Sequence, residues 1–367
     1  MRTRFASCVS LVLTAAALLG CGGGGGGGSS ASNQPAQITS ARFAFVANRD
    51  ANTISVFNVN QTTGLLSGSA TVATGGACVG PAYVELSAQH TMFVSCEFSN
   101  SIASFAVDTL TGNLTMIGSP VPSGVNPFIL TLDPTEKFLI VANISSNTLG
   151  VYSVSANGAL TEVAGSPFAT GAAPYVVKIS DSGNFVYVTN RDSNNVSVFG
   201  MNRTTGALTE IAGSPFASGL GARAIELSGN FAFVANRFAN NVAVFGVNAT
   251  SGALTPIAGS PFAVGMDPRS VAADSTGTHL YVGNTVSNDI SAFVIDTTTG
   301  SLTPMSGSPF PAGQVPLGIE IDKMGKVMFV PNSRSNSVSV FLIDSSGGLR
   351  TIQTMGTPGN AFSVAFM

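Results

Sequence analysis

The chain alternates short apolar runs with clusters of Gly, Asn, Ser and Thr, and this pattern repeats along its length. The clearest copy is residues 185–219, FVYVTNRDSNNVSVFGMNRTTGALTEIAGSPFASG. Around it we predict four strands, because apolar and polar positions alternate in the first and third and turn residues separate all four. These strands are at residues 175–180, 185–189, 196–201 and 207–212. The unit is therefore predicted to be a four-stranded antiparallel sheet.

Seven copies of this unit follow one another. The residues that end the second strand are 46 to 48 positions apart: Asn48, Cys96, Asn143, Asn190, Asn236, Asn284 and Asn332. Four residues later every copy has Asn, at Asn52, Asn100, Asn147, Asn194, Asn240, Asn288 and Asn336. We expect these paired Asn residues to shape the turn by hydrogen bonds to its backbone. A period in the forties with four short strands predicts an all-β, seven-bladed β-propeller over residues 41–367.

The two ends of the repeat array indicate how the ring closes. Residues 43–48 read as a second strand with no first strand before it, and residues 361–366 read as a first strand with nothing after it. We predict that the C-terminal strand completes the N-terminal blade, because this pairing removes two open sheet edges.

The N-terminal residues predict export. Arg2 and Arg4 precede an apolar run that ends at Gly20, the order found in secretory signals. Residues 18–21, LLGC, resemble a bacterial lipobox, which implies cleavage before Cys21 and lipidation of that residue. The alternative is an ordinary signal with a chance cysteine. Residues 21–40 then form a Gly/Ser-rich tether, so we expect a lipid-anchored envelope protein, with the outer membrane favoured and with the domain facing the periplasm or the cell surface.

The composition narrows the function classes. The chain is 44% hydrophobic and 9% charged with a net charge of −3, which fits a globular domain and provides no basic stripe for nucleic acid. Six of the nine Arg residues after the signal fall where a propeller exposes one face: Arg49, Arg191, Arg237 and Arg334 in turns after second strands, and Arg223 and Arg269 at the start of first strands. A column within the first strands reads Glu85, Thr131, Lys178, Glu226, Ala272, Glu320 and Ala365.

Two interpretations of these charges stay open. In one, Arg49, Arg191, Arg237, Arg334 and Lys178 bind an anionic ligand, because guanidinium groups pair bidentately with carboxylate or phosphate. In the other, the Arg turns are solvated and the inner-strand charges satisfy one another.

The second strand of the fourth copy contains YVTN, and the copies share Asn-x3-Asn followed by TG-x-L-T or a close variant of it. These residues resemble the YVTN repeat and the seven-bladed β-propeller lactonase family, whose namesake is bacterial 6-phosphogluconolactonase. The resemblance implies a hydrolytic site with Arg and His where first strands begin and Glu in a following turn. The matching segments keep Arg223 and Arg269 but have Ala224 and Ser270 in the His positions. For a hydrolase acting on a lactone or sugar acid, the candidate catalytic residues are thus Arg223, Arg269, Glu97 and Glu226.

The cysteines predict a disulfide. Cys8 leaves with the signal and Cys21 is the lipidation site, which leaves Cys78 and Cys96 on the Arg-rich face. In an oxidising compartment these two are expected to be bonded. Buried free thiols, or a metal site lacking two further ligands, are the alternatives. We expect no metal and no cofactor.

Three functions are compatible with the sequence. The leading hypothesis is a membrane-anchored, monomeric scaffold that binds a protein, an anionic glycan or a small molecule through its Arg-rich face. The alternatives are a lactonase-like hydrolase and a structural surface protein without a defined ligand.

Overall fold

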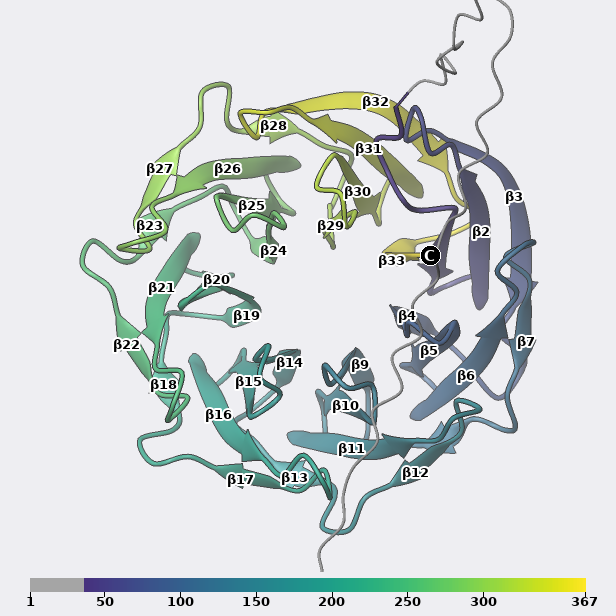
Figure 1. Ribbon diagram of the computed structural model, residues 1–367, viewed down its shortest axis with the longest axis horizontal. Helices are drawn as coiled ribbons and strands as arrows, with labels where there is room; N and C mark the ends of the chain where they lie inside the picture. Colours follow the sequence, from purple (N-terminus) through teal and green to yellow (C-terminus); the bar gives the residue numbers. More distant parts are fainter. Residues whose placement is uncertain (1–35) are drawn as a thin grey trace, which may run out of the picture. The chain divides into compact units, whose positions relative to one another are not determined.

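A computed structural model describes residues 36–367, and every regular element in this range is a β-strand. The predicted signal and Cys21 lie outside the described residues. The strands form seven antiparallel sheets arranged in a ring (Figure 1). In this range no helix is long and apolar enough to cross a bilayer. The predicted seven-bladed β-propeller is confirmed.

Five consecutive blades share one pattern, in which four strands follow one another outward from the centre of the ring and a short fifth strand pairs with the third. Blade 2 contains β4 (Pro81–Leu86), β5 (Thr91–Cys96), β6 (Ser101–Val107), β7 (Leu114–Met116) and β8 (Val121–Pro122). Blade 3 contains β9 (Pro127–Leu132), β10 (Phe138–Asn143), β11 (Thr148–Val154), β12 (Leu160–Glu162) and β13 (Phe168–Ala169). Blade 4 contains β14 (Pro174–Ile179), β15 (Phe185–Asn190), β16 (Asn195–Met201), β17 (Leu208–Glu210) and β18 (Phe216–Ala217). Blade 5 contains β19 (Ala222–Ser228), β20 (Phe231–Asn236), β21 (Asn241–Val247), β22 (Leu254–Pro256) and β23 (Phe262–Ala263). Blade 6 contains β24 (Pro268–Ala273), β25 (His279–Asn284), β26 (Asp289–Ile295), β27 (Leu302–Pro304) and β28 (Phe310–Pro311).

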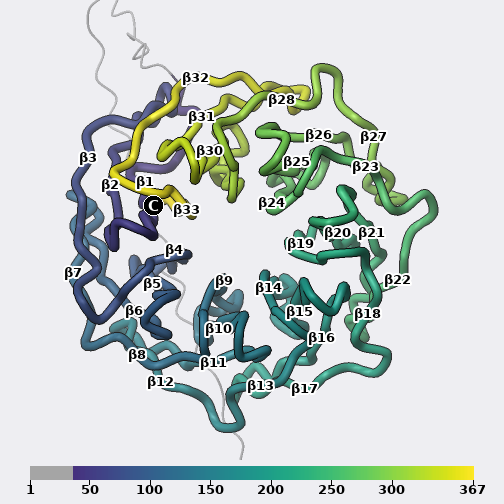
Figure 2. Tube along the Cα trace, turned by 180° about the vertical axis from the view of Figure 1, so that it is seen from behind, coloured from purple at the N-terminus to yellow at the C-terminus, as the bar shows by residue number. Residues whose placement is uncertain are grey.

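Blades 1 and 7 have four strands each and a continuous outer strand. Blade 7 contains β29 (Glu320–Ile321), β30 (Val327–Asn332), β31 (Ser337–Ile343) and β32 (Leu349–Gly356). Blade 1 contains β33 (Ala361–Phe366), β1 (Phe43–Asn48), β2 (Thr53–Val59) and β3 (Leu66–Ala73). Both outer strands lie along the rim (Figure 2).

The outer strand of the regular blades differs from the prediction. In blade 4 the fourth strand was expected over residues 207–212, whereas β17 spans Leu208–Glu210 and a second short strand, β18, pairs with β16. Between them Ser214 precedes a cis proline, and its Oγ accepts a hydrogen bond from Val198 N at 2.9 Å. The GSPF segment therefore folds back onto the third strand, which interrupts the outer edge.

The ring closes as predicted. Strand β33 pairs antiparallel with β1, with Phe45 opposite Ala365. A second link lies at the rim, where the Gln353 side chain accepts from Leu66 N at 2.7 Å and donates to Leu66 O at 2.8 Å. Because these links join the two ends of the chain, blade 1 has no open inner edge.

The two Asn columns have different tasks. Asn190 stays within its blade, where Nδ2 donates to Ser197 Oγ at 2.9 Å. Asn194 adopts a positive φ of 58°, and its Oδ1 accepts from Gly221 N at 2.7 Å in the connection that enters the next blade. The same bond to the next blade is made by Asn52, Asn100, Asn147, Asn240 and Asn288. The expected bonds from both Asn side chains to the backbone of their own turn are therefore not found in blade 4: the first column bonds to side chains of the third strand, and the second links neighbouring blades.

The first described residues already belong to the propeller. Ile38 packs against the core between blades 7 and 1, and its N donates to Gln61 O at 2.8 Å. The predicted tether end at residue 40 thus falls a few residues late. Gln61 lies in the turn between β2 and β3, so the chain enters on the face opposite the start of the first strands.

Candidate functional site

The first strands of the blades line the channel, and a β-bulge near their start decides which side chains face it. In blade 4 the register with β15 shifts between Pro174 and Val177, and blades 1, 2, 3, 5 and 6 show comparable shifts. A bulge inserts one extra residue and re-aims the neighbouring side chains. Side chains at the second, third and fifth positions of these strands therefore line the same channel.

Two layers of side chains result. The collar consists of Phe128, Tyr175, Arg223, Arg269 and Phe362, each at the second position of its strand, and of Leu317, which precedes β29. The lower layer contains Glu85, Thr131, Lys178 and Glu226 at the fifth position, and Glu320 at the start of β29. The layers are three residues apart along each strand, which corresponds to about 10 Å at the usual rise.

The collar is built from stacked aromatic and guanidinium groups. The Arg223 guanidinium lies 3.9 Å from the Tyr175 ring centroid. Tyr175 meets Phe128 edge-on at 4.7 Å, and Phe128 meets Phe362 at 5.5 Å. Arg49 lies 5.0 Å from the Phe362 ring on the other side. These contacts narrow the channel to a cavity of about 40 Å³ at this level.

Arg223 is the distinctive group of the collar. It is only 5% exposed, and no carboxylate in the range 36–367 lies within ion-pair distance of it. Burial lowers the pKa of Arg223 to about 10, although Tyr175 opposes this shift. A buried cation without a counter-charge is costly, so an anionic ligand at this point would be stabilising.

Arg269 and Arg237 share one carboxylate. Arg269 Nη2 lies 2.7 Å from Asp267 Oδ2, and Arg237 Nε lies 2.6 Å from Asp267 Oδ1. Burial of Asp267 opposes ionisation, but these hydrogen bonds outweigh it and hold its pKa at about 2. The triplet therefore carries one net positive charge across blades 5 and 6.

The remaining Arg candidates point elsewhere. Arg191 pairs with its neighbour Asp192 at 2.6 Å and lies 5.3 Å from the Tyr175 ring. Arg334 lies in the turn after β30 and, within the described chain, has no carboxylate within 4.0 Å. Neither Arg191 nor Arg334 lines the channel cavities. The predicted Arg-rich face thus exists, but most of its guanidinium groups are internally satisfied.

Glu97 belongs to the junction of blades 1 and 2. Arg49 Nε lies 2.7 Å from Glu97 Oε2, out of line for a hydrogen bond, and Arg49 Nη2 donates to Oε1 at 3.3 Å. Burial raises the pKa of Glu97 and Arg49 counteracts this. An ion-paired carboxylate in this position holds two blades together and is poorly available for proton transfer.

The lower layer contains one ion pair and two carboxyl groups without a cation. Lys178 Nζ lies 2.7 Å from Glu226 Oε2; burial alone would lower the pKa of Lys178, and Glu226 raises it. Glu85 accepts a hydrogen bond from Leu132 N at 3.3 Å. Burial raises the pKa of Glu85 to about 7 and that of Glu320 to about 8. These groups line a polar cavity of about 290 Å³.

The channel brings three of the four catalytic candidates together. Arg223 and Arg269 line its collar cavity, Arg269 and Glu226 line the lower cavity, and Glu97 lies apart in a turn. Sequence reasoning missed the aromatic half of the collar, Phe128, Tyr175 and Phe362. The sequence showed that these residues share the second position of the first strands. It did not show the bulge that turns their side chains toward the channel. No group of three His, Cys, Asp or Glu side chains among the described residues is placed to hold a metal ion.

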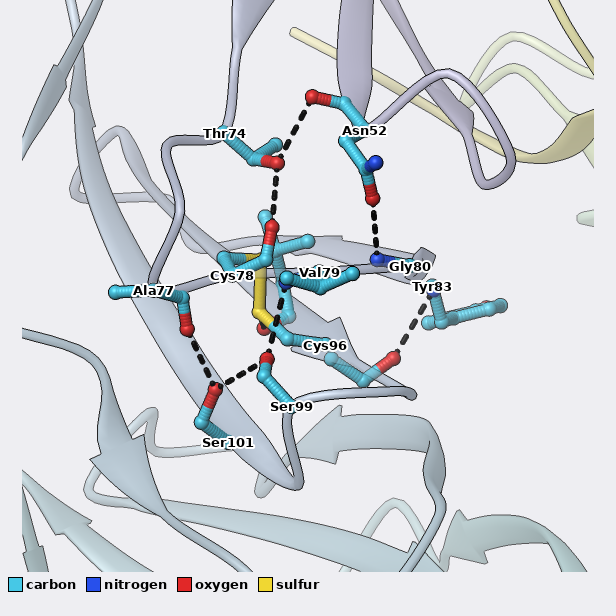
Figure 3. The surroundings of a disulfide bond; sticks show 12 residues. Asn52, Thr74, Ala77, Cys78, Val79, Gly80, Tyr83, Cys96, Ser99 and Ser101 are labelled. Atoms are coloured by element: carbon cyan, nitrogen blue, oxygen red, sulfur yellow. Dashed lines mark hydrogen bonds between the residues drawn. A yellow bond between two sulfur atoms is a disulfide. The ribbon is translucent and has the colours of Figure 1, made fainter.

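Cys78 and Cys96 are joined by a disulfide, with 5.0 Å between their Cα atoms (Figure 3). Both are fully buried. Around them Thr74 Oγ1 donates to Cys78 O at 2.7 Å, and Asn52 Oδ1 accepts from Gly80 N at 2.8 Å. The disulfide therefore fastens the connection that enters blade 2, beside the link from blade 1.

Comparison with known proteins agrees with this architecture. The family "Lactonase, 7-bladed beta-propeller" matches residues 24–131, 129–219 and 212–313. The chain therefore belongs to the seven-bladed β-propeller lactonase family. No protein of curated function matches the chain in sequence.

Solved structures share the fold at low identity. A Bacteroides fragilis protein assigned as a 6-phosphogluconolactonase has a TM-score of 0.79 and 21% identity, covering 91% of this chain and 100% of its own. The periplasmic gluconolactonase of Pseudomonas aeruginosa has a TM-score of 0.78 and 20% identity, covering 89% and 98%. Virginiamycin B lyase of Staphylococcus aureus, at a TM-score of 0.53 and 16% identity over 75% and 85%, shows that related propellers carry other chemistry.

Proposed function

We propose that this protein is a lactonase-type hydrolase that opens a lactone in the central channel. The observation that carries the proposal is the buried Arg223 without a counter-charge, in the collar directly above a polar cavity of about 290 Å³. Membership of the lactonase family supports the same reaction class. The binding-scaffold hypothesis is weaker, because most Arg groups of the exposed face are paired within the protein.

The reaction adds water to the acyl carbon of the lactone. A base takes a proton from the water, the acyl C–O bond breaks, and the ring oxygen leaves as a hydroxyl group with one proton. Arg269 lines both cavities, so its N–H groups are placed to stabilise negative charge on the acyl oxygen.

Glu85 is the carboxylate best suited to act as the base. It has no cation within ion-pair distance in the described part of the chain, unlike Glu97 and Glu226. A pKa of about 7 leaves a large share of Glu85 ionised at neutral pH while keeping it basic enough to accept a proton. Because the ionised form is required, kcat/KM should fall as the pH drops below about 7.

A panel of lactones tests this proposal. The wild type should hydrolyse at least one member, and Glu85→Gln or Arg269→Ala should lower kcat/KM roughly 100-fold. In Glu85→Gln the rising limb near pH 7 should also disappear. Arg203→Ala, an exposed Arg in the turn after β16, is the matched control and should keep full activity. Absence of hydrolysis across five- and six-membered lactones would refute the hydrolase.

The envelope location is part of the same proposal. The lipobox-like residues 18–21 and the Gly-rich stretch after Cys21 support it. The Cys21→Ser variant should move from the membrane to the soluble fraction and lose incorporation of labelled palmitate. Unchanged membrane association of that variant would contradict anchoring through Cys21.

A further inference from the structure

We infer that the substrate is the lactone of a sugar dicarboxylic acid, a hydroxylated lactone that retains one free carboxylate. This inference rests on the proposed hydrolase and specifies its substrate class. It comes from the different chemistry of the two layers of the channel, one of which suits a single flat anion and the other a set of hydroxyl groups.

The collar is suited to one carboxylate. Arg223 is its single guanidinium without a carboxylate partner, since Arg269 and Arg237 are held by Asp267. A planar carboxylate matches the fork of a guanidinium group. The space at this level is about 40 Å³ between Tyr175, Phe128 and their neighbours, which favours a flat anionic group over a tetrahedral phosphoryl group.

The lower layer is suited to hydroxyl groups. Within its cavity Glu85, Glu226 and Glu320 offer carboxyl oxygens, and Lys178 and Thr131 offer donors. Such mixed donors and acceptors match a polyhydroxylated ring. Because Lys178 is already paired with Glu226, the lower layer also offers no free cation to balance a second anionic charge on the ligand at this depth. A phosphorylated substrate is therefore a poor match for the channel.

The separation of the layers sets the length of the ligand. They are three strand residues apart, or about 10 Å between backbone levels, and long Arg and Glu side chains bridge part of this gap. A six-carbon diacid lactone has its carboxylate at one end and its acyl carbon at the other. With the carboxylate on Arg223, the acyl carbon reaches toward Glu85. Hydrolysis then creates a second carboxylate beside the acidic layer, whose repulsion favours product release.

A matched pair of substrates tests this inference. Galactaric acid 1,4-lactone and galactono-1,4-lactone share the ring and differ at C6, where the first has a carboxylate and the second a hydroxymethyl group. We expect the wild type to prefer the diacid lactone by about 30-fold in kcat/KM, the range of a charge-assisted hydrogen bond. Arg223→Gln should reduce this preference to about threefold or less, Arg223→Lys should retain part of it, and Arg203→Gln should leave it unchanged.

Binding of the intact lactones to Glu85→Gln, which should not turn them over, separates the two proposals. Galactaric acid 1,4-lactone should bind this variant at least tenfold more tightly than galactono-1,4-lactone by calorimetry, and adding Arg223→Gln should remove the difference. Tyrosine fluorescence is a second readout, because the chain has five Tyr and no Trp, and Tyr175 stacks on Arg223. Arg223-dependent binding of galactaric acid 1,4-lactone without any lactone turnover by the wild type would support the ligand class and refute the hydrolase. Turnover with equal or better rates on galactonolactone or 6-phosphogluconolactone would overturn the ligand class and leave the hydrolase standing.

Discussion

Blades 2 and 4 fasten the connection into their first strand with different chemistry. In blade 4, Gly171 lies directly against Asn190, and a Cβ at Gly171 would come within 2.7 Å of the Asn190 amide carbon. In blade 2 the corresponding residues are Cys78 and Cys96, which form the disulfide. The Asn190 amide also bonds to its own third strand, whereas blade 2 has a covalent bond in its place.

In blades 2 to 7 the Gly and Asn positions change together. The same close approach recurs at Gly124 with Asn143, Gly219 with Asn236, Gly265 with Asn284 and Gly313 with Asn332. Glycine is required there because the Asn amide occupies the space of a side chain. When blade 2 replaces Asn by the smaller Cys96, the partner position accommodates Cys78. Blade 2 thus departs from blades 3 to 7 at two aligned positions, Cys78 and Cys96, and these two residues are in contact. Two departures in the same blade can therefore identify a contact.

The two blades also differ at the channel. In the lower layer blade 2 has Glu85 where blade 4 has Lys178, and only Lys178 has an ion-pair partner there, Glu226. In both blades the Asn of the turn after the second strand, Asn100 or Asn194, accepts a hydrogen bond from a backbone N–H of the next blade. The fold therefore does not impose the difference in the lower layer. Residues that repeat build the ring, and residues that vary within a column carry the chemistry of the channel.

The largest effect is expected at blade 1, the blade whose strands come from both chain ends. Deletion of residues 360–367 removes β33 and exposes the inner edge of β1, so stability should fall by on the order of 5 kcal/mol or more. Thermal unfolding by circular dichroism measures the loss. A truncated protein with an unchanged Tm would contradict closure through β33.

The disulfide of blade 2 is expected to contribute about 3 kcal/mol, given the 18-residue separation of its cysteines. The double variant Cys78→Ala/Cys96→Ala should lose this in urea unfolding. The double variant Cys78→Gly/Cys96→Asn restores the pairing used by blade 4 and should recover about half or more of the loss. Equal stability of the two double variants would show that the Gly–Asn contact does not replace the disulfide.

The unpaired carboxyl groups of the lower layer predict a pH dependence of stability. The pKa values of Glu85 and Glu320 rise from an ordinary 4.5 to about 7 and about 8 in the folded protein. Their contribution is therefore complete below about pH 4.5 and is lost as the pH rises through 7 and 8. Glu85→Gln should reduce the drop in unfolding free energy between pH 5 and pH 8 by on the order of 2 kcal/mol. An unchanged drop in that variant would refute the assignment.

The Gly–Asn contact of blade 4 is tested by Gly171→Ala, which forces a Cβ against the Asn190 amide. We expect a loss of about 2 kcal/mol in urea unfolding. Gly76→Ala is the matched control, since a Cβ there meets no atom within 4 Å, and it should be close to neutral. Similar stability of the two variants would mean that the close approach in blade 4 is easily relaxed.

The smallest effect is expected from the hydrogen bond by which an Asn side chain links its blade to the next. Asn194→Gly keeps the positive φ but removes the bond to Gly221 N, which should cost about 1 kcal/mol. Asn336→Gly is the control, because the Asn336 side chain makes no such bond to its neighbour blade in the described structure. If both variants lose the same stability, the hydrogen bond between Asn194 and Gly221 contributes nothing to the free energy of unfolding beyond the effect of Asn on the turn itself.

The number of blades, their order and the closure by the last strand were predictable from the sequence. The period of the repeat, the alternation of apolar and polar residues and the turn residues can all be read from short stretches of sequence. Residues 43–48 and 361–366 show which strand is missing from the unit at each end of the repeat array. The Arg-rich face was predictable for the same reason, because turn positions such as Arg49 and Arg191 follow from strand order.

Only the tertiary structure decided which of these charges are free. The pairing of Arg237 with Asp267, and of Glu226 with Lys178, joins residues from different blades whose distance depends on the ring. The bulge near the start of the first strands breaks the strict alternation on which sequence reasoning relies, so the position of Tyr175 in the collar beside Arg223 was not foreseen. Local patterns specify strands and turns, whereas the site depends on bulges and on distances between blades.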